Sequence, residues 1–453
     1  MLYCHNKQKN TENNPLLLSF AKNGGMEAGM LNNKKKDMTP FDMNKKPVKQ
    51  YPFLLPLIWG GAWLMTRSLG LKIEKAGMEK MKPPYLVLST HQGFSDYYIA
   101  PLALFPHRAN YVSDMEGFAA FGEWLYRGIG CIGKRRYVSD IAVVKNIYTA
   151  LHKNRQIVAV FPESRHSNAG TTAYIPQNMG KLAKLMKVPV VMLSVHGSYL
   201  AGPFWDEAHT RKVPLRAKLE CIYTKEELAQ AQEDDVQQKI EEHLRYDEYK
   251  WQWEEKIAIT YPRRAEGLHM ALYQCRSCGK AFHMKSKGSS LFCEACGSGW
   301  EMDEYGRLVG EKKKITAIPD WYEWQRGEVE KEIGNETYRC EFAVRVEALP
   351  NAKGFIPMGE GRLVQEESGF TLSVQNRELF FDHRSRESVQ TEYNYRDRGP
   401  CIVLSDKDCC YYIYSDDPGF GPTKIQFAGE YYYRMRKQGE VPFDFGKHLS
   451  ENM

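Results

Sequence analysis

The chain lacks a hydrophobic run long enough to span a bilayer. Its longest mostly apolar stretch, residues 51–66, holds sixteen uncharged residues, whereas a spanning helix needs about 20. Residues 1–50 are polar and rich in Lys and Asn, which predicts no secretory signal. The 11 cysteines, an odd number among 453 residues, indicate thiols or metal ligands in a reducing, cytoplasmic protein.

Two catalytic signatures are also missing. The segment "GIGCIGKR" (128–135) nearly matches the phosphate-binding loop Gly-x4-Gly-Lys-Ser/Thr, but Arg135 replaces the hydroxyl residue that ligates Mg²⁺. The sequence contains no Gly-x-Ser-x-Gly motif. These absences argue against nucleotide hydrolysis and against a serine hydrolase of the α/β type.

Positive charge is concentrated in the first half of the chain. Residues 1–50 carry nine lysines against four acidic residues, and residues 51–225 carry 22 basic against 11 acidic residues. The whole chain has a net charge of +6, so the remainder is net negative by 10. The basic half predicts either an anionic partner (lipid headgroups, a phosphorylated substrate or nucleic acid) or a solvated positive face.

Composition and patterning divide the chain into six segments. Strand-like runs at 85–89, 109–114, 157–163 and 188–197 alternate with helix-like runs, which predicts an α/β domain with a largely parallel sheet. Alternating strands and turns after residue 335 predict a small β-rich domain. The predicted segments are a basic mobile arm (1–50), an interfacial membrane anchor (51–70), the α/β domain (71–225), a charged helical linker (226–270), a cysteine module (271–305) and the β-rich C-terminal domain (306–453).

The anchor prediction rests on the 51–66 stretch. It is too short to span and contains prolines and glycines, while Trp59 and Trp63 suit the headgroup level. A basic arm precedes it, and lipid anchoring commonly needs both signals. The alternative is a buried first helix of the next domain.

The stretch "STHQGFSDYYIAP" (89–101) contains His91 and Asp96 directly after an expected strand. A neutral imidazole is the usual general base at pH 7, and a carboxylate can hold its second nitrogen and stabilise the imidazolium. We expect the intervening loop to bring the two side chains together, with Gly93 permitting the turn and Ser95 capping the next helix. By itself the pair does not exclude a mere capping aspartate.

Three further blocks follow in order: "GCIGKRR" (130–136), a plausible phosphate grip; "FPESRHS" (161–167) after a strand; and "VPVV" (188–191) opening another strand. Together with His-x4-Asp, they resemble the glycerophospholipid acyltransferase family, which includes 1-acylglycerol-3-phosphate acyltransferases. The resemblance covers about residues 51–225. The third block departs from the family's usual Phe-Pro-Glu-Gly-x-Arg-Ser, since Ser164 replaces glycine and His166 replaces arginine.

The resemblance implies a fold, a reaction and roles for residues. His91 is implied to be the base for the acceptor hydroxyl, with Asp96 orienting it. The acyl group is implied to come from coenzyme A or acyl carrier protein, with no acyl-enzyme and no catalytic metal. The implied acceptor-binding residues are Arg135 and Glu163, to which we add Lys134, Ser164 and Arg165 as neighbours in the same blocks.

The cysteine module predicts a structural metal site. "CRSC" (275–278) and "CEAC" (293–296) are 14 residues apart, and each is followed by glycine. This spacing is typical of a zinc ribbon with Cys275, Cys278, Cys293 and Cys296 as ligands. Four thiolates close the coordination sphere, so the zinc is expected to be structural; iron in a rubredoxin-like site is the alternative.

The sequence therefore predicts an acyltransferase that acylates lysophosphatidate at the cytoplasmic face of the cell membrane, bound peripherally or monotopically to anionic lipids. The alternatives are another lyso-lipid acceptor, or a non-catalytic lipid-binding scaffold with a degenerate domain. Because residues 226–453 are net acidic, we expect the ribbon to dock to the enzyme domain, to acyl carrier protein or to a partner, with no nucleic acid. The segment "EYYYRMRK" (430–437) is either an interface or an ordinary amphipathic element.

Overall fold

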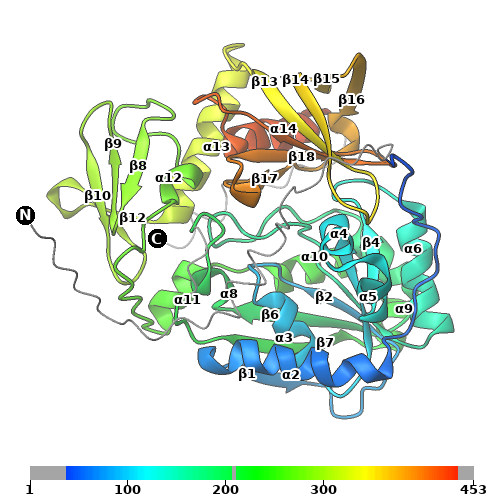
Figure 1. Ribbon diagram of the computed structural model, residues 1–453. Coiled ribbons are helices and arrows are strands. Elements are labelled where there is room, and N and C mark those ends of the chain that lie inside the picture. The colour runs from blue at the N-terminus through cyan, green and yellow to red at the C-terminus, as the bar shows by residue number, and fades with distance from the viewer. Residues whose placement is uncertain (1–36, 207–210, 437–453) are drawn as a thin grey trace, which may run out of the picture. The chain divides into compact units, whose positions relative to one another are not determined.

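The computed structural model describes residues 37–206 and 211–436, which belong to one compact unit. Most of the predicted basic arm (residues 1–36) lies outside these described residues. The chain forms three sheets in sequence order: an α/β part, a small sheet that carries the cysteines, and a larger antiparallel sheet (Figure 1).

The first sheet confirms the predicted α/β fold. Its seven strands lie in the order β1-β7-β6-β2-β5-β3-β4, and every neighbouring pair is parallel except β6 and β7. The central strands are fully buried because helices cover both faces of the sheet. The strands are β1 (Lys72–Ala76), β2 (Leu86–Ser89), β3 (Ala109–Asp114), β4 (Cys131–Lys134), β5 (Ile157–Val160), β6 (Val190–His196) and β7 (Arg216–Tyr223).

Alternation along β2 shows how the two faces are covered. Val87 packs into one core cluster with Ile99. Leu88 points the other way and packs into a second cluster with Met186 and Ile240. The helices up to residue 271 are η1 (Pro52–Leu54), α2 (Leu55–Thr66), η2 (Arg67–Leu69), α3 (Asp96–Ala103), α4 (Met115–Phe121), α5 (Glu123–Gly128), α6 (Ile141–Tyr148), η3 (Thr149–Lys153), α7 (Met179–Met186), α8 (Ser198–Ala201), α9 (Lys225–Gln230), α10 (Glu233–Leu244), α11 (Glu248–Glu254) and α12 (Leu268–Ala271).

The predicted linker contributes to this same core. Helix α10 packs against α7 and β6, and it buries Val236 and Ile240. The domain boundaries drawn from the sequence stay a prediction.

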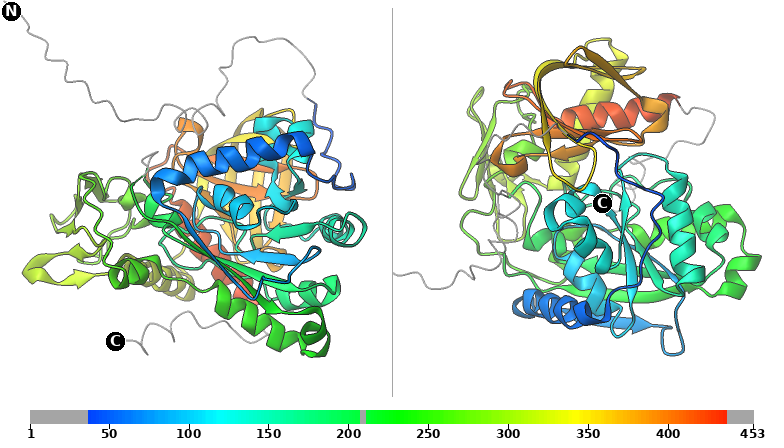
Figure 2. Two further views of the ribbon diagram at one scale, coloured as in Figure 1. Left: turned by 90° about the horizontal axis from the view of Figure 1, so that it is seen from below. Right: turned by 45° about the vertical axis from the view of Figure 1, so that its right-hand side comes forward.

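Helix α2 lies on the outside of the α/β part, next to α3 (Figure 2). It buries only three of its 12 residues, Leu55, Ala62 and Thr66, although nearly all its side chains are apolar. Within the described residues, no helix combines the length and apolar character needed to cross a bilayer. The helix thus presents an apolar surface outward.

The second sheet has five strands in the order β12-β11-β10-β9-β8, with antiparallel neighbours. Cys275 and Cys278 precede β8, whereas Cys293 ends β9 and Cys296 lies in the turn that follows it. The elements are β8 (Met284–Lys287), β9 (Ser290–Cys293), β10 (Gly299–Met302), β11 (Leu308–Val309), η4 (Glu311–Lys313) and β12 (Ile315–Thr316).

The third sheet confirms the β-rich C-terminal region. Its seven antiparallel strands lie in the order β16-β15-β14-β13-β19-β18-β17. Two long helices pack against each other beside it. The elements are α13 (Ile318–Gly334), β13 (Glu341–Leu349), β14 (Ile356–Glu366), β15 (Gly369–Val374), β16 (Arg377–Asp382), η5 (His383–Ser385), β17 (Gln390–Glu392), η6 (Tyr395–Asp397), β18 (Cys401–Ser405), β19 (Cys410–Tyr414) and α14 (Pro422–Arg436).

The end of α14 resolves the "EYYYRMRK" segment as far as residue 436. Glu430, Tyr432 and Tyr433 are buried there, and the intervening positions are more open. The segment is therefore an ordinary amphipathic element packed inside the protein.

Candidate active site

His91 and Asp96 meet at the C-terminal end of β2. His91 follows the strand by two residues, and Asp96 is the first residue of α3. The His91 Nδ1 lies 3.2 Å from the Asp96 Oδ2, and both side chains are buried. The sequence prediction that the loop brings these two residues together is confirmed.

The same carboxylate also holds the loop in shape. Asp96 Oδ2 accepts hydrogen bonds from the backbone N–H groups of Gln92 (2.6 Å) and Gly93 (3.1 Å). Ser95 is the N-cap residue of α3, as predicted, but its side chain makes no capping hydrogen bond. One carboxylate therefore shapes the loop and orients the imidazole.

Gly93 is needed for a reason other than the predicted turn. Its backbone φ lies outside the left-handed region, but an added Cβ would lie 3.0 Å from the carbonyl oxygen of Ser198. The loop approaches the start of α8 so closely that a side chain at this position would require its neighbour to shift. The glycine therefore lets the His91 loop pack flat against the neighbouring element.

The contact to Asp96 defines what His91 can do. If Nδ1 carries the proton that Asp96 accepts, Nε2 keeps its lone pair, and the described residues provide no hydrogen bond to Nε2. The carboxylate then stabilises the imidazolium that forms when Nε2 takes a proton. This geometry suits a general base with one free nitrogen.

Glu163 holds the backbone of His91 in place. One carboxyl oxygen accepts the His91 backbone N–H (2.8 Å), and the other accepts the Ala173 N–H (2.7 Å) and the Tyr246 hydroxyl (3.1 Å). These contacts make it a positioning residue for His91 in this structure. Burial raises the pKa of the Glu163 carboxyl to about 8.

This raised pKa predicts a pH-dependent stability. The folded state holds a proton that the unfolded chain releases, so the contribution is complete below the ordinary glutamate pKa and is lost as pH rises through about 8. Each pKa unit corresponds to about 1.4 kcal/mol, so the wild type should lose a few kcal/mol of stability relative to Glu163→Gln from pH 4.5 to 8. Urea melts across this range measure it.

Glu254→Gln serves as the control, because Glu254 is exposed at the end of α11. Its melts should follow the wild-type pH dependence. An unchanged pH dependence in Glu163→Gln would show that the Glu163 carboxyl does not retain the proton.

Of the predicted acceptor-binding residues, two lie together. The Lys134 Nζ, at the end of β4, donates to the Ser164 hydroxyl at 2.8 Å. Ser164 in turn follows Glu163 directly, so this pair lies one residue from the carboxylate that holds His91.

The two predicted arginines are engaged elsewhere. The Arg135 guanidinium donates to the backbone carbonyls of Lys407 (2.7 Å), Asp408 (3.0 Å) and Pro350 (3.3 Å). Arg165 lies 3.6 Å from Glu430 of α14. Both side chains are buried in contact with the C-terminal region. Their roles in acceptor binding stay a prediction that these contacts disfavour.

Arg136 belongs to the predicted phosphate grip (130–136), but it was not among the acceptor-binding residues chosen from it. It pairs with Asp114, and its charge, together with burial and His91, lowers the pKa of His166 well below its usual value. The Arg136 charge therefore acts on the histidine beside the base. The signal was present in the sequence, because Arg136 is one of the three successive basic residues that end the block at 130–136.

Aromatic rings surround the base. The His91 ring centroid lies 4.4 Å from that of His166, 4.5 Å from Phe161 and 5.7 Å from Tyr97. Phe94, which contacts the His166 ring at 4.9 Å, exposes 63% of its surface. The rim of the site is therefore apolar.

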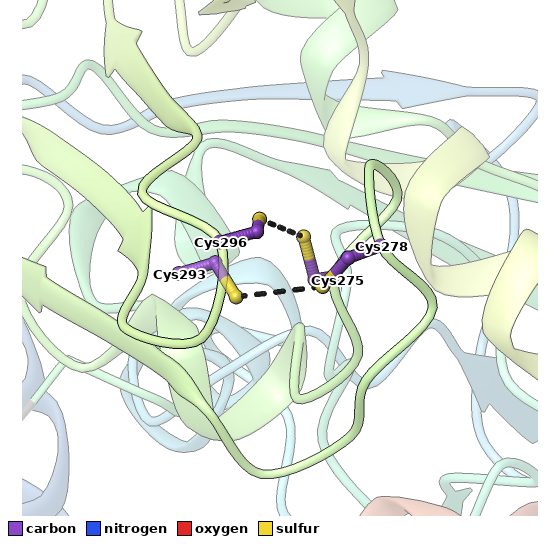
Figure 3. Close-up of side chains that lie close together, drawn as sticks. All are labelled: Cys275, Cys278, Cys293 and Cys296. Atoms are coloured by element: carbon purple, nitrogen blue, oxygen red, sulfur yellow. Dashed lines mark hydrogen bonds between the residues drawn. The ribbon is translucent and has the colours of Figure 1, made fainter.

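The four predicted metal ligands also converge (Figure 3). Their sulfurs all lie within 4.8 Å of one another, with 3.8 Å between Cys275 and Cys296 and between Cys278 and Cys293. Tetrahedral zinc with bonds of about 2.3 Å places its sulfurs about 3.8 Å apart. The four thiols therefore fit one structural metal ion.

Comparison with known proteins identifies the α/β part. Residues 72–196 match the family model described as Acyltransferase, which confirms the acyltransferase domain and the prediction of an acyltransferase enzyme. No curated protein matches the chain. Six chains of solved structures match, among them the 1-acyl-sn-glycerophosphate (LPA) acyltransferase PlsC from Thermotoga maritima, with 16% identity, a TM-score of 0.35 and coverage of 42% of this chain and 76% of that one.

Proposed function

Because residues 72–196 form a domain of the acyltransferase family, we propose that the chain acylates the free hydroxyl of lysophosphatidate, or of a similar lysophospholipid, at a membrane surface. The acyl donor is acyl-coenzyme A or acyl carrier protein. The observation that carries this proposal is the buried His91–Asp96 pair, whose outer imidazole nitrogen is left without a partner among the described residues.

The pair supports a direct transfer. His91 Nε2 accepts the proton of the acceptor hydroxyl while the hydroxyl oxygen attacks the thioester carbonyl carbon. The tetrahedral intermediate collapses, the carbon–sulfur bond breaks, and the thiolate leaves with the proton that His91 returns. Asp96 stabilises the transient imidazolium. The new ester is formed without an acyl-enzyme.

Lys134 and Arg136 are the cations that support a phosphate-bearing acceptor. Lys134 is the last residue of β4, Arg136 follows two residues later, and the Arg136 charge acts on His166 beside the base. Cations placed beside the base offset the charge of a phosphate next to the reacting hydroxyl.

A second acceptor class is favoured by a specific observation. Arg135 and Arg165 are bound by backbone carbonyls and by Glu430, and Asp114 already pairs with Arg136. The site therefore has fewer unpaired cationic side chains to bind the doubly charged phosphate of lysophosphatidate than the sequence predicted. A lyso-lipid whose phosphate carries a further headgroup is the alternative.

One assay separates these acceptors. Purified protein in vesicles is offered lysophosphatidate and lysophospholipids with other headgroups, each with acyl-coenzyme A and with acyl carrier protein donors. Preferred acylation of lysophosphatidate supports the first acceptor, and preferred acylation of another lyso-lipid supports the second. Vesicle binding without any acyl transfer supports a non-catalytic scaffold instead.

The membrane part of the proposal rests on exposed apolar side chains of and around α2. Leu57 and Trp63 expose 71% and 57% of their surfaces. Large exposed apolar side chains of this kind indicate that the helix inserts into a membrane to the depth of the lipid headgroups. The exposed apolar side chains that we assign to this membrane-facing surface are Phe53, Leu57, Trp63, Leu64, Phe94, Phe121 and Trp124.

Because Phe94 belongs both to this surface and to the ring cluster at His91, the surface extends to the rim of the site. A lyso-lipid could then pass from the bilayer to the base with its acyl chain kept in apolar surroundings. The excess of basic residues over residues 51–225 supports a membrane with anionic lipids on its cytoplasmic side.

Replacing Leu57 and Trp63 by Gln is expected to weaken binding to anionic vesicles by about 10-fold or more, because two apolar side chains no longer leave water. Vesicle co-sedimentation measures this. The matched control replaces Ile315 and Phe380, which are similarly exposed on the other two sheets, by Gln. Equal binding by both double variants would contradict the assignment of this surface.

A further inference from the structure

His166 lies against the base, three residues after Glu163. Its ring meets the His91 ring edge to face, with 4.4 Å between centroids and 72° between planes. It also contacts Phe94 at 4.9 Å and Phe204 at 5.7 Å. Only 9% of the residue is exposed. His166 is thus part of the wall beside the reacting nitrogen.

The ring carries a buried nitrogen without a partner. His166 Nε2 is enclosed and makes no hydrogen bond within the described residues. Leaving a buried polar atom unsatisfied costs about 1–3 kcal/mol. The other aromatic residues packed around the two histidines include phenylalanines at positions 94, 161 and 204, which have no polar atom to satisfy. A histidine that served only for packing would carry this unfavourable free energy without any compensating hydrogen bond. We therefore infer that the hydrogen-bond partner of Nε2 is a substrate atom.

The surroundings also fix the charge of His166. Burial, the adjacent His91 and the Arg136 guanidinium all lower its pKa well below the usual value. A neutral imidazole offers one N–H donor. His166 is therefore suited to donate a hydrogen bond and unsuited to compete with His91 for the acceptor's proton.

Two substrate oxygen atoms change charge during the proposed transfer. The acceptor hydroxyl oxygen is served by His91, and the thioester carbonyl oxygen becomes negative as the new carbon–oxygen bond forms. We propose that His166 is a catalytic residue that donates its Nε2 hydrogen to this carbonyl oxygen. The donor keeps its proton throughout; the bond strengthens in the tetrahedral intermediate and weakens when the thiolate leaves. This inference rests on the proposed function.

The test is acyl transfer by His166→Phe and His166→Gln beside the wild type. Phenylalanine keeps the ring and removes the donor, whereas the glutamine amide can reach the place of Nε2. Loss of one such donor lowers kcat by about 100-fold or more. We expect this loss in His166→Phe with little change in KM, and a kcat for His166→Gln within about 10-fold of wild type.

His107→Phe is the matched control, because His107 precedes β3 and so lies at the opposite edge of the parallel strands from His91. Wild-type kcat in His166→Phe, or equal losses in the Phe and Gln variants, overturns the inference. If His166→Phe melts at a lower temperature, His166→Leu provides the same comparison. An inactive wild type contradicts the proposed function itself, whereas an active wild type with a fully active His166→Phe contradicts this inference alone.

Discussion

Replacing His91 by Ala is expected to lower kcat by about 10²–10⁴-fold while the protein stays folded. The imidazole is the group positioned by both Asp96 and Glu163, and its outer nitrogen is left for the acceptor. Without it, no side chain takes the hydroxyl proton, so the alkoxide must form unaided. Initial rates with saturating donor and the preferred lyso-lipid measure the effect.

Asp96→Asn extends the same test. The amide can still accept from the Gln92 and Gly93 N–H groups, which keeps the loop in shape, but it no longer carries the charge that stabilises the imidazolium. We expect a large loss of kcat with an unchanged melting temperature. His107→Ala is the control for removing a histidine. Wild-type rates in His91→Ala would show that the pair is structural and would support the scaffold alternative.

Loss of the structural metal is expected to destabilise the sheet β8–β12. The four thiols converge from two turns, and Cys275 and Cys293 are buried at the base of the site. Structural zinc sites of this kind contribute about 10–16 kcal/mol of apparent binding free energy near pH 7. Cys293→Ser should therefore lower the zinc content from about one per chain toward zero and lower the melting temperature.

Cys221→Ser is the matched control, because Cys221 is a half-buried thiol of β7 that is outside the cysteine cluster. It should keep its zinc. Elemental analysis of the wild type also separates zinc from the rubredoxin-like alternative, since iron bound by four thiolates is coloured and zinc is not. A chain that binds neither metal and melts like Cys293→Ser would contradict the metal site.

Local patterns in the sequence predicted the parts of the site that lie close together along the chain. The His91 and Asp96 spacing was sufficient because a short loop limits where the two side chains can go, and strand β2 delivers them to one edge of the sheet. The same holds for the cysteines. The two members of each pair are close in the sequence, so the fold had only to bring the two pairs together.

The same local reasoning was incomplete where backbone detail mattered. It placed Ser95 correctly at the N-cap of α3, but the serine side chain makes no capping hydrogen bond. The Asp96 carboxylate accepts instead from two N–H groups of the loop before the helix. The role of Arg135 in acceptor binding stays a prediction, which its hydrogen bonds to distant backbone carbonyls disfavour. Both cases concern the direction of one side chain, which local patterns do not determine.

The sequence by itself determined the chemistry available to this protein: a base with its carboxylate, an α/β scaffold and four thiols for one metal. Only the tertiary structure decided which charges face the substrate. Arg165 meets Glu430 and Arg135 meets Lys407 across more than 260 residues of chain, and His166 meets His91 from the end of a different strand. Such contacts depend on how whole sheets pack, because packing buries apolar faces together and brings distant polar side chains into one place.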